Sequence, residues 1–224
     1  MTTDDSVAQE QQQQQQATTT TATNLDSQDA SGRKSTTATS TSSELAGVKV
    51  TITKSLRRFA DFPIPGIDFV DIMPLFHDPV AHATLLRALQ LQVSEMFPND
   101  KPDIVVGLDA RGFLFGPALA LQLGAGFTAV RKKGKLPGPC ITAEYIKEYG
   151  KDFFQMQEDG IEKGQKVLVV DDIIATGGSA TAAGDLVKQL GGDLMGFLFI
   201  LEIPGLKGRD KLDNVPVSIL IEES

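Results

Sequence analysis

The sequence contains a single cysteine in 224 residues and no long apolar run. With Cys140 as its one thiol, the chain cannot form an intrachain disulfide, and a reducing compartment is expected. No stretch approaches the roughly 20 apolar residues that a membrane-spanning helix needs. Asp4, Asp5 and Glu10 precede the first basic residue, Arg33, and no basic region is followed by an apolar core. These features argue against a secretory signal and a transit peptide.

Positive charge is also scarce, since 21 Lys and Arg residues face 29 Asp and Glu residues for a net charge of -8. The sequence pI is about 4.8. We therefore expect no nucleic-acid partner and no binding to anionic membranes. The exception is RKKGKLPGP, residues 131–139, which opens with four cations in five residues. We expect a mobile loop, approximately residues 131–150, that closes over a polyphosphate; a merely solvated run of charges is the alternative.

The first part of the chain differs in composition from the rest. Residues 1–43 are rich in Gln, Thr and Ser, include the glutamine run Gln11–Gln16, and almost lack large apolar side chains. Such a segment cannot bury enough apolar surface to offset its conformational entropy. We expect a disordered tail, followed by one domain over residues 44–224.

The start of that domain mixes helical and loop signals. Apolar residues return over residues 44–59 and predict a helix, on which Arg57 and Arg58 would be solvated charges. The next stretch, FPIPGIDFVDI at residues 62–72, contains two prolines and a glycine and predicts a stiff loop. Within it, Phe69 is suited either to stacking on a planar ligand or to core packing.

The remainder alternates between strand and helix patterns. Helical spacing covers residues 78–97, up to Pro98, and residues 113–123. Strands are predicted at Ile104–Val106, Phe127–Val130, Val167–Val170, Leu194–Leu201 and Val217–Ile221, with an extended segment at Ile141–Tyr149. This alternation predicts an α/β fold with a parallel sheet.

The most informative stretch is Val167–Thr181, VLVVDDIIATGGSAT. A buried strand ends in two carboxylates, Asp171 and Asp172, where α/β proteins bind ligands. A Gly-rich turn then runs into a helix and would present free N–H groups to a phosphate. The stretch lacks the P-loop and dinucleotide-fold patterns and suits a sugar phosphate instead. An ordinary strand and tight turn is the alternative, disfavoured because burying two adjacent acids is costly.

A second anion-binding pattern is GLDARGF, Gly107–Phe113. Arg111 follows Asp109 by two residues on a strand-to-helix turn, where a guanidinium can bind a phosphate group with two hydrogen bonds. A structural Asp109–Arg111 ion pair is the alternative.

The central stretch closely resembles the 5-phosphoribosyl-1-pyrophosphate (PRPP) signature of type I phosphoribosyltransferases. Over residues 62–181, FPIPGIDFVDI, GLDARGFLFGPALA, RKKGKLPGP, EYGK and VVDDIIATGGSA occur in the order found in the adenine-specific members of that family. The resemblance implies a type I fold, with a central mostly parallel sheet flanked by helices and a small N-terminal hood, approximately residues 44–75. It also implies a pentosyltransferase that makes AMP and pyrophosphate from adenine and PRPP in cytoplasmic purine salvage. A homodimer is implied, with Mg²⁺ held mainly through PRPP and its direct protein ligands left open.

The resemblance assigns roles to individual residues. Ribose and its 5′-phosphate would be held by Asp171, Asp172, Ala175, Thr176, Gly177, Gly178 and Ser179. Pyrophosphate would meet Asp109, Ala110, Arg111, Arg131 and Lys135, the last two within the subunit or across the dimer. Adenine would meet Phe69, Val70 and Ile173. The catalytic residues would be Arg111 and Glu148, the latter as acid or base beside the base nitrogen.

One position departs from the family pattern. Many members read Phe-Arg-Asp in the hood where this chain reads Phe69-Val70-Asp71. A role for that arginine side chain would put base specificity in doubt, whereas a backbone contact would be served equally by Val70. Two other functions stay open: a phosphoribosyltransferase for another base, such as xanthine or a pyrimidine, and a non-catalytic PRPP-sensing regulator on the same fold. The regulator would have less need of the cationic loop and Glu148.

Overall fold

The computed structural model describes residues 33–62, 65–66, 68–147 and 150–222. The chain divides into two compact units, residues 1–38 and residues 39–224. The described part of the first unit is the beginning of helix α2 (Arg33–Ser55). That helix therefore starts inside the segment expected to lack structure. All that follows concerns the second unit.

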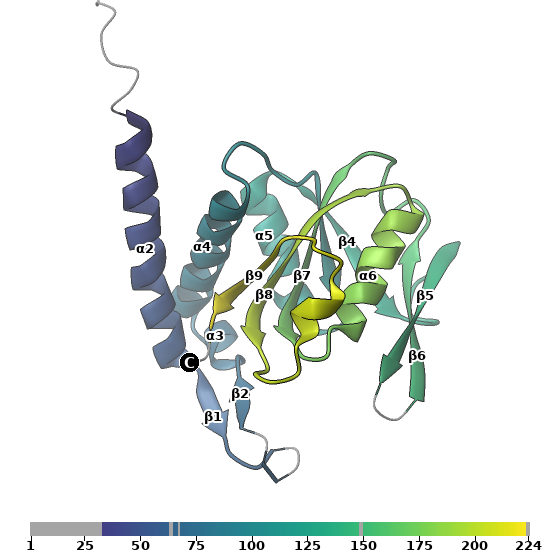
Figure 1. Ribbon diagram of the computed structural model, residues 1–224, viewed down its shortest axis with the longest axis horizontal. Helices are drawn as coiled ribbons and strands as arrows, with labels where there is room; N and C mark the ends of the chain where they lie inside the picture. The colour runs from purple at the N-terminus through teal and green to yellow at the C-terminus, as the bar shows by residue number, and fades with distance from the viewer. Residues whose placement is uncertain (1–32, 63–64, 67, 148–149, 223–224) are drawn as a thin grey trace, which may run out of the picture. The chain divides into compact units, whose positions relative to one another are not determined.

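The second unit is built on a seven-stranded sheet in the order β5-β6-β4-β3-β7-β8-β9 (Figure 1). The strands are β3 (Ile104–Leu108), β4 (Gly126–Lys132), β5 (Cys140–Lys147), β6 (Gly150–Gln157), β7 (Lys166–Ile174), β8 (Asp193–Glu202) and β9 (Val217–Ile221). The five from β4 across to β9 are parallel, and the β5–β6 hairpin extends the sheet in antiparallel pairing. The predicted α/β fold with a mostly parallel sheet is confirmed; strand β6 was not predicted.

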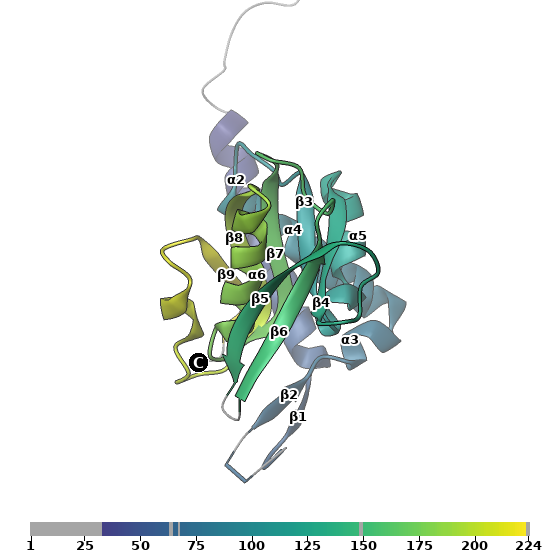
Figure 2. The ribbon, with the colours of Figure 1, turned by 90° about the vertical axis from the view of Figure 1, so that its right-hand side faces the viewer.

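Helices cover both faces of this sheet, as Figure 2 shows for α5 and α6. They are α4 (Pro79–Met96), α5 (Gly116–Leu123) and α6 (Gly178–Gln189). Leu168 and Val170 of β7 belong to the hydrophobic cluster that includes α4 and α5. Val167 and Val169 belong to the cluster that includes α6. Burial on both faces explains why this strand reads as an unbroken apolar run.

The direction of the chain changes between β3 and β7. From β3 the chain passes through α5 to β4, on one side, and from β7 through α6 to β8, on the other. In open parallel sheets the crevice at such a switch point, beyond the carboxyl ends of the strands, is where ligands bind. The fold therefore places the segments after β3 and β7 side by side.

The predicted helix at residues 78–97 is confirmed as α4. Asp78 precedes it and accepts a hydrogen bond from the Val80 N–H at 2.9 Å, and Pro79 occupies its first turn. Both are favourable ways to begin a helix. No helix in the described part of the chain is long and apolar enough to cross a membrane.

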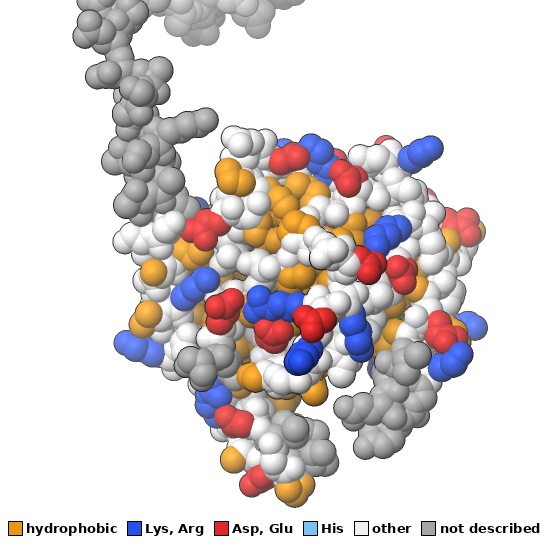
Figure 3. Space-filling model, viewed as in Figure 1, with side chains coloured by type: hydrophobic (Ala, Val, Ile, Leu, Met, Phe, Trp, Pro, Cys, Tyr) orange, Lys and Arg blue, Asp and Glu red, His pale blue; other side chains and the backbone are white. Residues whose placement is uncertain are grey.

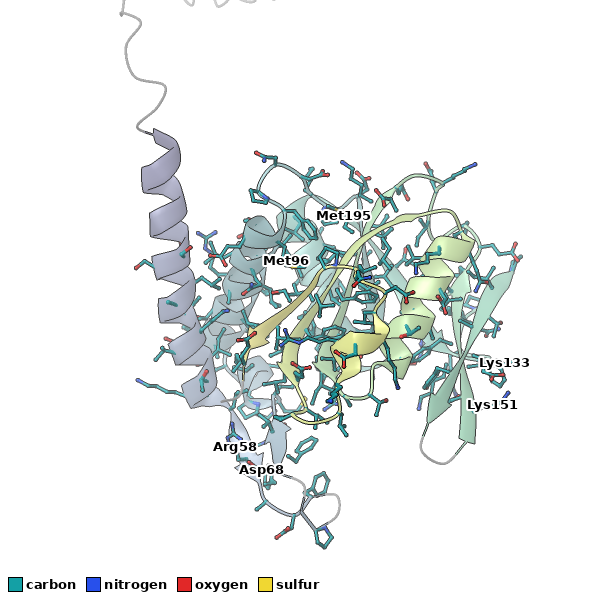
Figure 4. All side chains as sticks on the ribbon, viewed as in Figure 1. Arg58, Asp68, Met96, Lys133, Lys151 and Met195 are labelled. Carbon is teal, nitrogen blue, oxygen red and sulfur yellow. The ribbon has the colours of Figure 1, made fainter. Side chains whose placement is uncertain are left out.

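A small hairpin precedes the main sheet, where the end of a helix and then a loop were expected. Strands β1 (Arg57–Phe59) and β2 (Phe69–Asp71) pair antiparallel, and the short helix α3 (Pro74–His77) follows. Arg57 and Arg58 lie on β1 rather than on a helix. Arg57 donates to Asp71 from Nε at 3.1 Å, and Arg58 donates to Asp68 at 2.9 Å, the latter pair labelled in Figure 4. Cross-strand ion pairs thus stabilise a segment that Pro and Gly content alone suggested was a loop.

Candidate active site

A cavity of about 240 Å³ lies beyond the carboxyl ends of β3 and β7. Its lining residues are Asp109, Ala110, Arg111, Asp171, Asp172, Ile173, Ile174, Ala175, Thr176, Gly177, Gly178, Ser179, Ala180 and Phe199. The fold therefore gathers the Asp pair, the Gly-rich turn and the Arg111 turn around one space. The Arg111 turn lies about 60 residues before the Asp pair and the Gly-rich turn, which follow one another in the chain, and it was singled out separately.

The two aspartates lie within β7 rather than after it. The ladder with β8 continues past them, so that Asp171 stands opposite Phe199 and Ile173 opposite Leu201. Asp172 is only 3% exposed. Its backbone N–H donates to Asp171 Oδ1 at 2.9 Å, and Arg111 Nε lies 3.0 Å from Asp172 Oδ2. One guanidinium therefore accompanies two closely placed carboxyl groups.

Burial sets the electrostatics of this pair. Burial raises the pKa of Asp171 well above its usual value, repulsion from Asp172 raises it further, and Arg111 opposes the rise. Burial also raises the pKa of Asp172, against the attraction of Arg111. Both carboxylates are thus costly to keep charged and would gain from hydroxyl donors or a cation entering the cavity.

The Gly-rich turn between β7 and α6 has the geometry of an anion cradle. Gly177 precedes α6 with a left-handed φ of 81°, which glycine adopts without steric cost. Among the described residues, no side chain caps this end of the helix. The N–H groups of a helix's first turn have no partner within the helix, and they point toward its positive end. The cavity therefore ends at backbone donors suited to a phosphate.

The turn after β3 carries the second set of charges. The Asp109–Ala110 peptide bond is cis, and the Asp109 N–H donates to Val130 O at 2.9 Å. The Asp109–Arg111 ion pair considered above is not the pairing found. Arg111 pairs with Asp172, and Asp109 Oδ2 instead lies 3.2 Å from Arg131 Nε.

A glycine makes the close approach of this turn to β7 achievable. Gly112 lies in the 3₁₀ helix η1 (Arg111–Leu114), where an added Cβ would come within 2.9 Å of Val170 O and 3.3 Å of Asp171 Oδ1. A larger residue would push the turn away from the strand. The glycine therefore allows Arg111 to reach Asp172.

The cationic segment begins in a strand and is tied to the hairpin beside it. Arg131 ends β4 together with Lys132, donates to Lys135 O at 3.1 Å and lies 6.0 Å from the Phe113 ring centroid. The Gly134 N–H donates to Gln155 Oε1 on β6 at 2.8 Å. Neither Arg131 nor Lys135 lines the cavity.

The other side of this segment also contacts β6. The Lys133 N–H donates to Phe153 O at 3.0 Å, and its Nζ lies 5.3 Å from the Phe153 ring centroid. Figure 4 shows Lys133 beside the β5–β6 hairpin. The described part of the cationic loop is therefore held on a strand.

Of the three residues predicted to bind adenine, only one lines the cavity. Ile173 lines the cavity, whereas Phe69 and Val70 do not. Val70 is 8% exposed and packs in the hydrophobic core, so its side chain is directed to packing. Phe69 is half-buried and meets Phe62 edge-on, with ring centroids 5.2 Å apart. Glu148 lies outside the described residues.

Three residues of the cavity wall were not predicted as site residues: Ile174, Ala180 and Phe199. Phe199 lines the cavity from β8, opposite Asp171 in the sheet. It sits inside an apolar run with no feature to separate it from core residues, so no sequence signal was available.

Among the described residues, no group of three or more His, Cys, Asp or Glu side chains is arranged to hold a metal ion.

Comparison with known proteins agrees with this geometry. A family model described as "Phosphoribosyl transferase domain" matches residues 80–220. The adenine phosphoribosyltransferase of Yarrowia lipolytica is 59% identical over 157 residues, covering 70% of this chain and 86% of that protein. The corresponding protein of Debaryomyces hansenii is 56% identical over 177 residues, covering 79% and 93%.

A solved structure gives the same result. The adenine phosphoribosyltransferase of Saccharomyces cerevisiae, crystallised with adenine and an imino-altritol bisphosphate, matches with a TM-score of 0.76 and 50% identity, covering 79% of this chain and 99% of that one. The chain therefore belongs to the phosphoribosyltransferase family, and within it to the adenine phosphoribosyltransferases.

Proposed function

We propose that the chain transfers the 5-phosphoribosyl group of PRPP to adenine, releasing AMP and pyrophosphate, and so acts as a glycosyltransferase of purine salvage. The observation that carries the proposal is the convergence of a Gly-rich helix start, a buried Asp pair and Arg111 on one cavity. This convergence occurs in a chain that is half or more identical to adenine phosphoribosyltransferases.

The 5′-phosphate would lie against Ala175–Ser179, at the uncapped start of α6. The buried carboxylates of Asp171 and Asp172 would accept hydrogen bonds from the ribose hydroxyls. This assignment accounts for the cost of burying two acids, because the substrate supplies the donors that bulk water otherwise provides. In this arrangement the sugar would be held both through its 5′-phosphate and through its hydroxyl groups.

Pyrophosphate would lie at the other end of the cavity, next to Asp109, Ala110 and Arg111. Arg111 is paired with a carboxylate yet its side chain is 41% exposed, so it can reach a departing anion. Arg131 and Lys135 stand outside the cavity lining and would join after loop closure, or from the partner of a homodimer. A cation already in place, such as Arg111, would stabilise the charge that develops as the bond to pyrophosphate breaks.

Mg²⁺ fits this site, although the described residues form no cage of three or more ligands. The ion is commonly bound through one or two carboxylates together with substrate phosphates, and Asp171 and Asp172 offer such carboxylates. Mg²⁺ bound with PRPP would neutralise charge on the departing pyrophosphate.

The protein's own groups would carry the remaining chemistry. Breaking the bond between ribose C1 and pyrophosphate leaves positive charge on the sugar ring, which the Asp pair can offset. Holding adenine close to C1 replaces a bimolecular encounter with a local one. We propose Glu148 as the group that accepts the base proton, a role worth roughly 10²–10⁴-fold in rate.

Adenine would be recognised by Ile173, the ring of Phe69 and the backbone around Val70. The burial of the Val70 side chain supports a backbone role at that position. Adenine specificity then does not depend on the arginine found there in many members of the family. We further propose a cytoplasmic homodimer, in keeping with the single cysteine and with the family resemblance.

The test is a panel of bases offered with PRPP, with and without Mg²⁺, with products identified by mass. Mg²⁺-dependent AMP from adenine, and little product from hypoxanthine, xanthine or uracil, is the expected result. A product from another base alone would assign a different specificity. PRPP binding without pyrophosphate release from any base would favour a PRPP-sensing regulator.

A further inference from the structure

The Gly-rich turn has a backing segment that the assigned site residues do not include. After β8 the chain passes through residues 203–207 and enters the 3₁₀ helix η2 (Gly208–Lys211). An added Cβ on Gly208 would collide with Ala175 O and lie 2.9 Å from the Gly177 nitrogen. Conversely, a Cβ on Gly177 would collide with Gly208 O. The two backbones therefore touch with no room for a side chain between them.

Further bonds hold the two segments together. The Ile203 N–H donates to Ile174 O at 2.9 Å, directly before the turn. The Thr181 hydroxyl of α6 lies 3.0 Å from Gly177 O and 3.4 Å from Lys211 O, so it lies between the turn and η2.

The backing segment is itself fixed at its base. Arg209 donates from Nε to Glu202 Oε2 at 2.7 Å, joining η2 to the end of β8. Figure 3 shows this face of the molecule, where basic and acidic side chains lie next to one another. The segment is thus anchored to the sheet independently of the turn that it contacts.

We propose that Gly208 is a positioning residue for phosphate binding: its bare backbone forms the back wall of the Ala175–Ser179 cradle and sets the direction of the cradle's N–H groups. This inference rests on the proposed function, because it assumes that the cradle holds the 5′-phosphate. The φ of Gly208 is not in the left-handed region, so alanine is compatible with its backbone. The cost of a side chain is therefore displacement of the cradle rather than local strain.

Gly208→Ala should consequently weaken binding of the phosphate specifically. The probes are AMP and adenosine, which differ only by the 5′-phosphate, titrated calorimetrically onto the full chain. We expect AMP to bind about tenfold more weakly than to wild type, the loss of roughly one hydrogen bond to a charged group. The adenosine affinity should stay within about twofold, because the base and ribose contacts lie elsewhere.

Gly196→Ala is the matched control. A Cβ there would come within 2.9 Å of a backbone oxygen, Pro216 O, at a point that does not line the cavity. It should lower the melting temperature as Gly208→Ala does, and leave the AMP-to-adenosine affinity ratio unchanged. If Gly208→Ala does not fold, Thr181→Val removes the bridging hydroxyl at constant volume and should lower the same ratio by about threefold.

The outcomes separate this inference from the function on which it rests. The role of Gly208 is overturned if Gly208→Ala has the AMP-to-adenosine affinity ratio of the wild type. Where Gly208→Ala fails to fold, the same result in Thr181→Val overturns it. An equal loss of this ratio in Gly196→Ala also overturns it. A wild type that binds AMP no better than adenosine overturns the phosphate cradle itself. A wild type that prefers AMP strongly but forms none from adenine and PRPP contradicts only the proposed reaction.

Discussion

The cradle at residues 175–179 and the cationic segment at residues 131–139 both face anions in our account, but they are built differently. The cradle is backbone, enclosed by β7, α6 and Gly208, with no room for an added methyl group. The cationic segment presents exposed lysines and is held by single hydrogen bonds to its neighbours. We infer that the cradle is sensitive to added side-chain volume and only weakly sensitive to salt. Anion binding by the cationic segment should instead be sensitive to the loss of a charge and should be screened by salt.

The largest effect is expected from the Asp pair, which lines the cavity beside the cradle. Changing Asp171→Asn and Asp172→Asn together should lower kcat/KM for PRPP by about 10³-fold or more, because preorganised charge at the reacting sugar is lost. Pyrophosphate release measures activity and circular dichroism checks the fold. Near wild-type turnover in a folded variant would refute the assignment of the central stretch.

The two arginines give the next contrast. Arg111→Met should lower kcat/KM by about 10²-fold, since it removes a cation inside the cavity and leaves Asp172 without its partner. Arg131→Met should cost only about tenfold, because the side chain is outside the cavity lining and 36% exposed.

Salt sharpens this second test. Raising the ionic strength from about 0.05 to 0.5 M should lower wild-type kcat/KM for PRPP markedly and that of Arg131→Met less. Equal salt dependence in the two proteins would show that the Arg131 charge does not act on the substrate.

A smaller effect is expected from removing the hydrogen bond that ties the cationic segment to β6, here called the tether. Gln155→Leu removes the acceptor of the Gly134 N–H, 2.8 Å away, and should raise KM for PRPP by about threefold. Gln165→Leu is the control, because Gln165 accepts from the Glu162 N–H at the same distance in a turn remote from the cavity. If the two variants share one KM, the tether does not position the cations.

The smallest effect is a change in stability with pH. The folded-state pKa of Asp171 is raised by burial, so its protonation stabilises the folded chain at low pH, and this stability is lost as pH rises through that pKa. Asp171→Asn should therefore melt higher than wild type at pH 7, and the difference should vanish toward about pH 4, the unfolded-state pKa.

An exposed carboxylate provides the opposite trend. The hydrogen bond from Lys166 lowers the pKa of Asp100, so its contribution is present above the unfolded-state pKa and lost on acidification. Asp100→Asn should melt slightly lower than wild type at pH 7 and match it at low pH. Parallel pH curves for the two variants would contradict the assigned shifts.

The sequence predicted local structure better than it predicted which charged side chains pair. The glycine turn before α6 and the buried strand β7 were predictable, because adjacent glycines favour a turn and a short unbroken apolar run favours a strand buried on both faces. The partners of Asp109 and Arg111 were not, since short-range spacing suggested a local pair while the sheet brought Arg131 and Asp172 closer. Arg57 and Arg58 were placed on a helix for the same reason, because their partners lie beyond a turn rich in proline and glycine.

Some site elements carried no sequence signal at all. Phe199 resembles any core residue of β8, and Gln155 any polar residue of a hairpin. Gly208 precedes a cation and follows another, in a segment that reads as a surface turn. Their relevance arises only when the folded chain brings them against the cradle or the cationic segment.

The most direct test of the account is the stoichiometry of the reaction catalysed by the wild-type chain. Adenine and PRPP with Mg²⁺ should give AMP and pyrophosphate in equal amounts, and AMP with pyrophosphate should regenerate PRPP. Release of pyrophosphate without AMP, or adenine left unconverted while PRPP is bound, would contradict it.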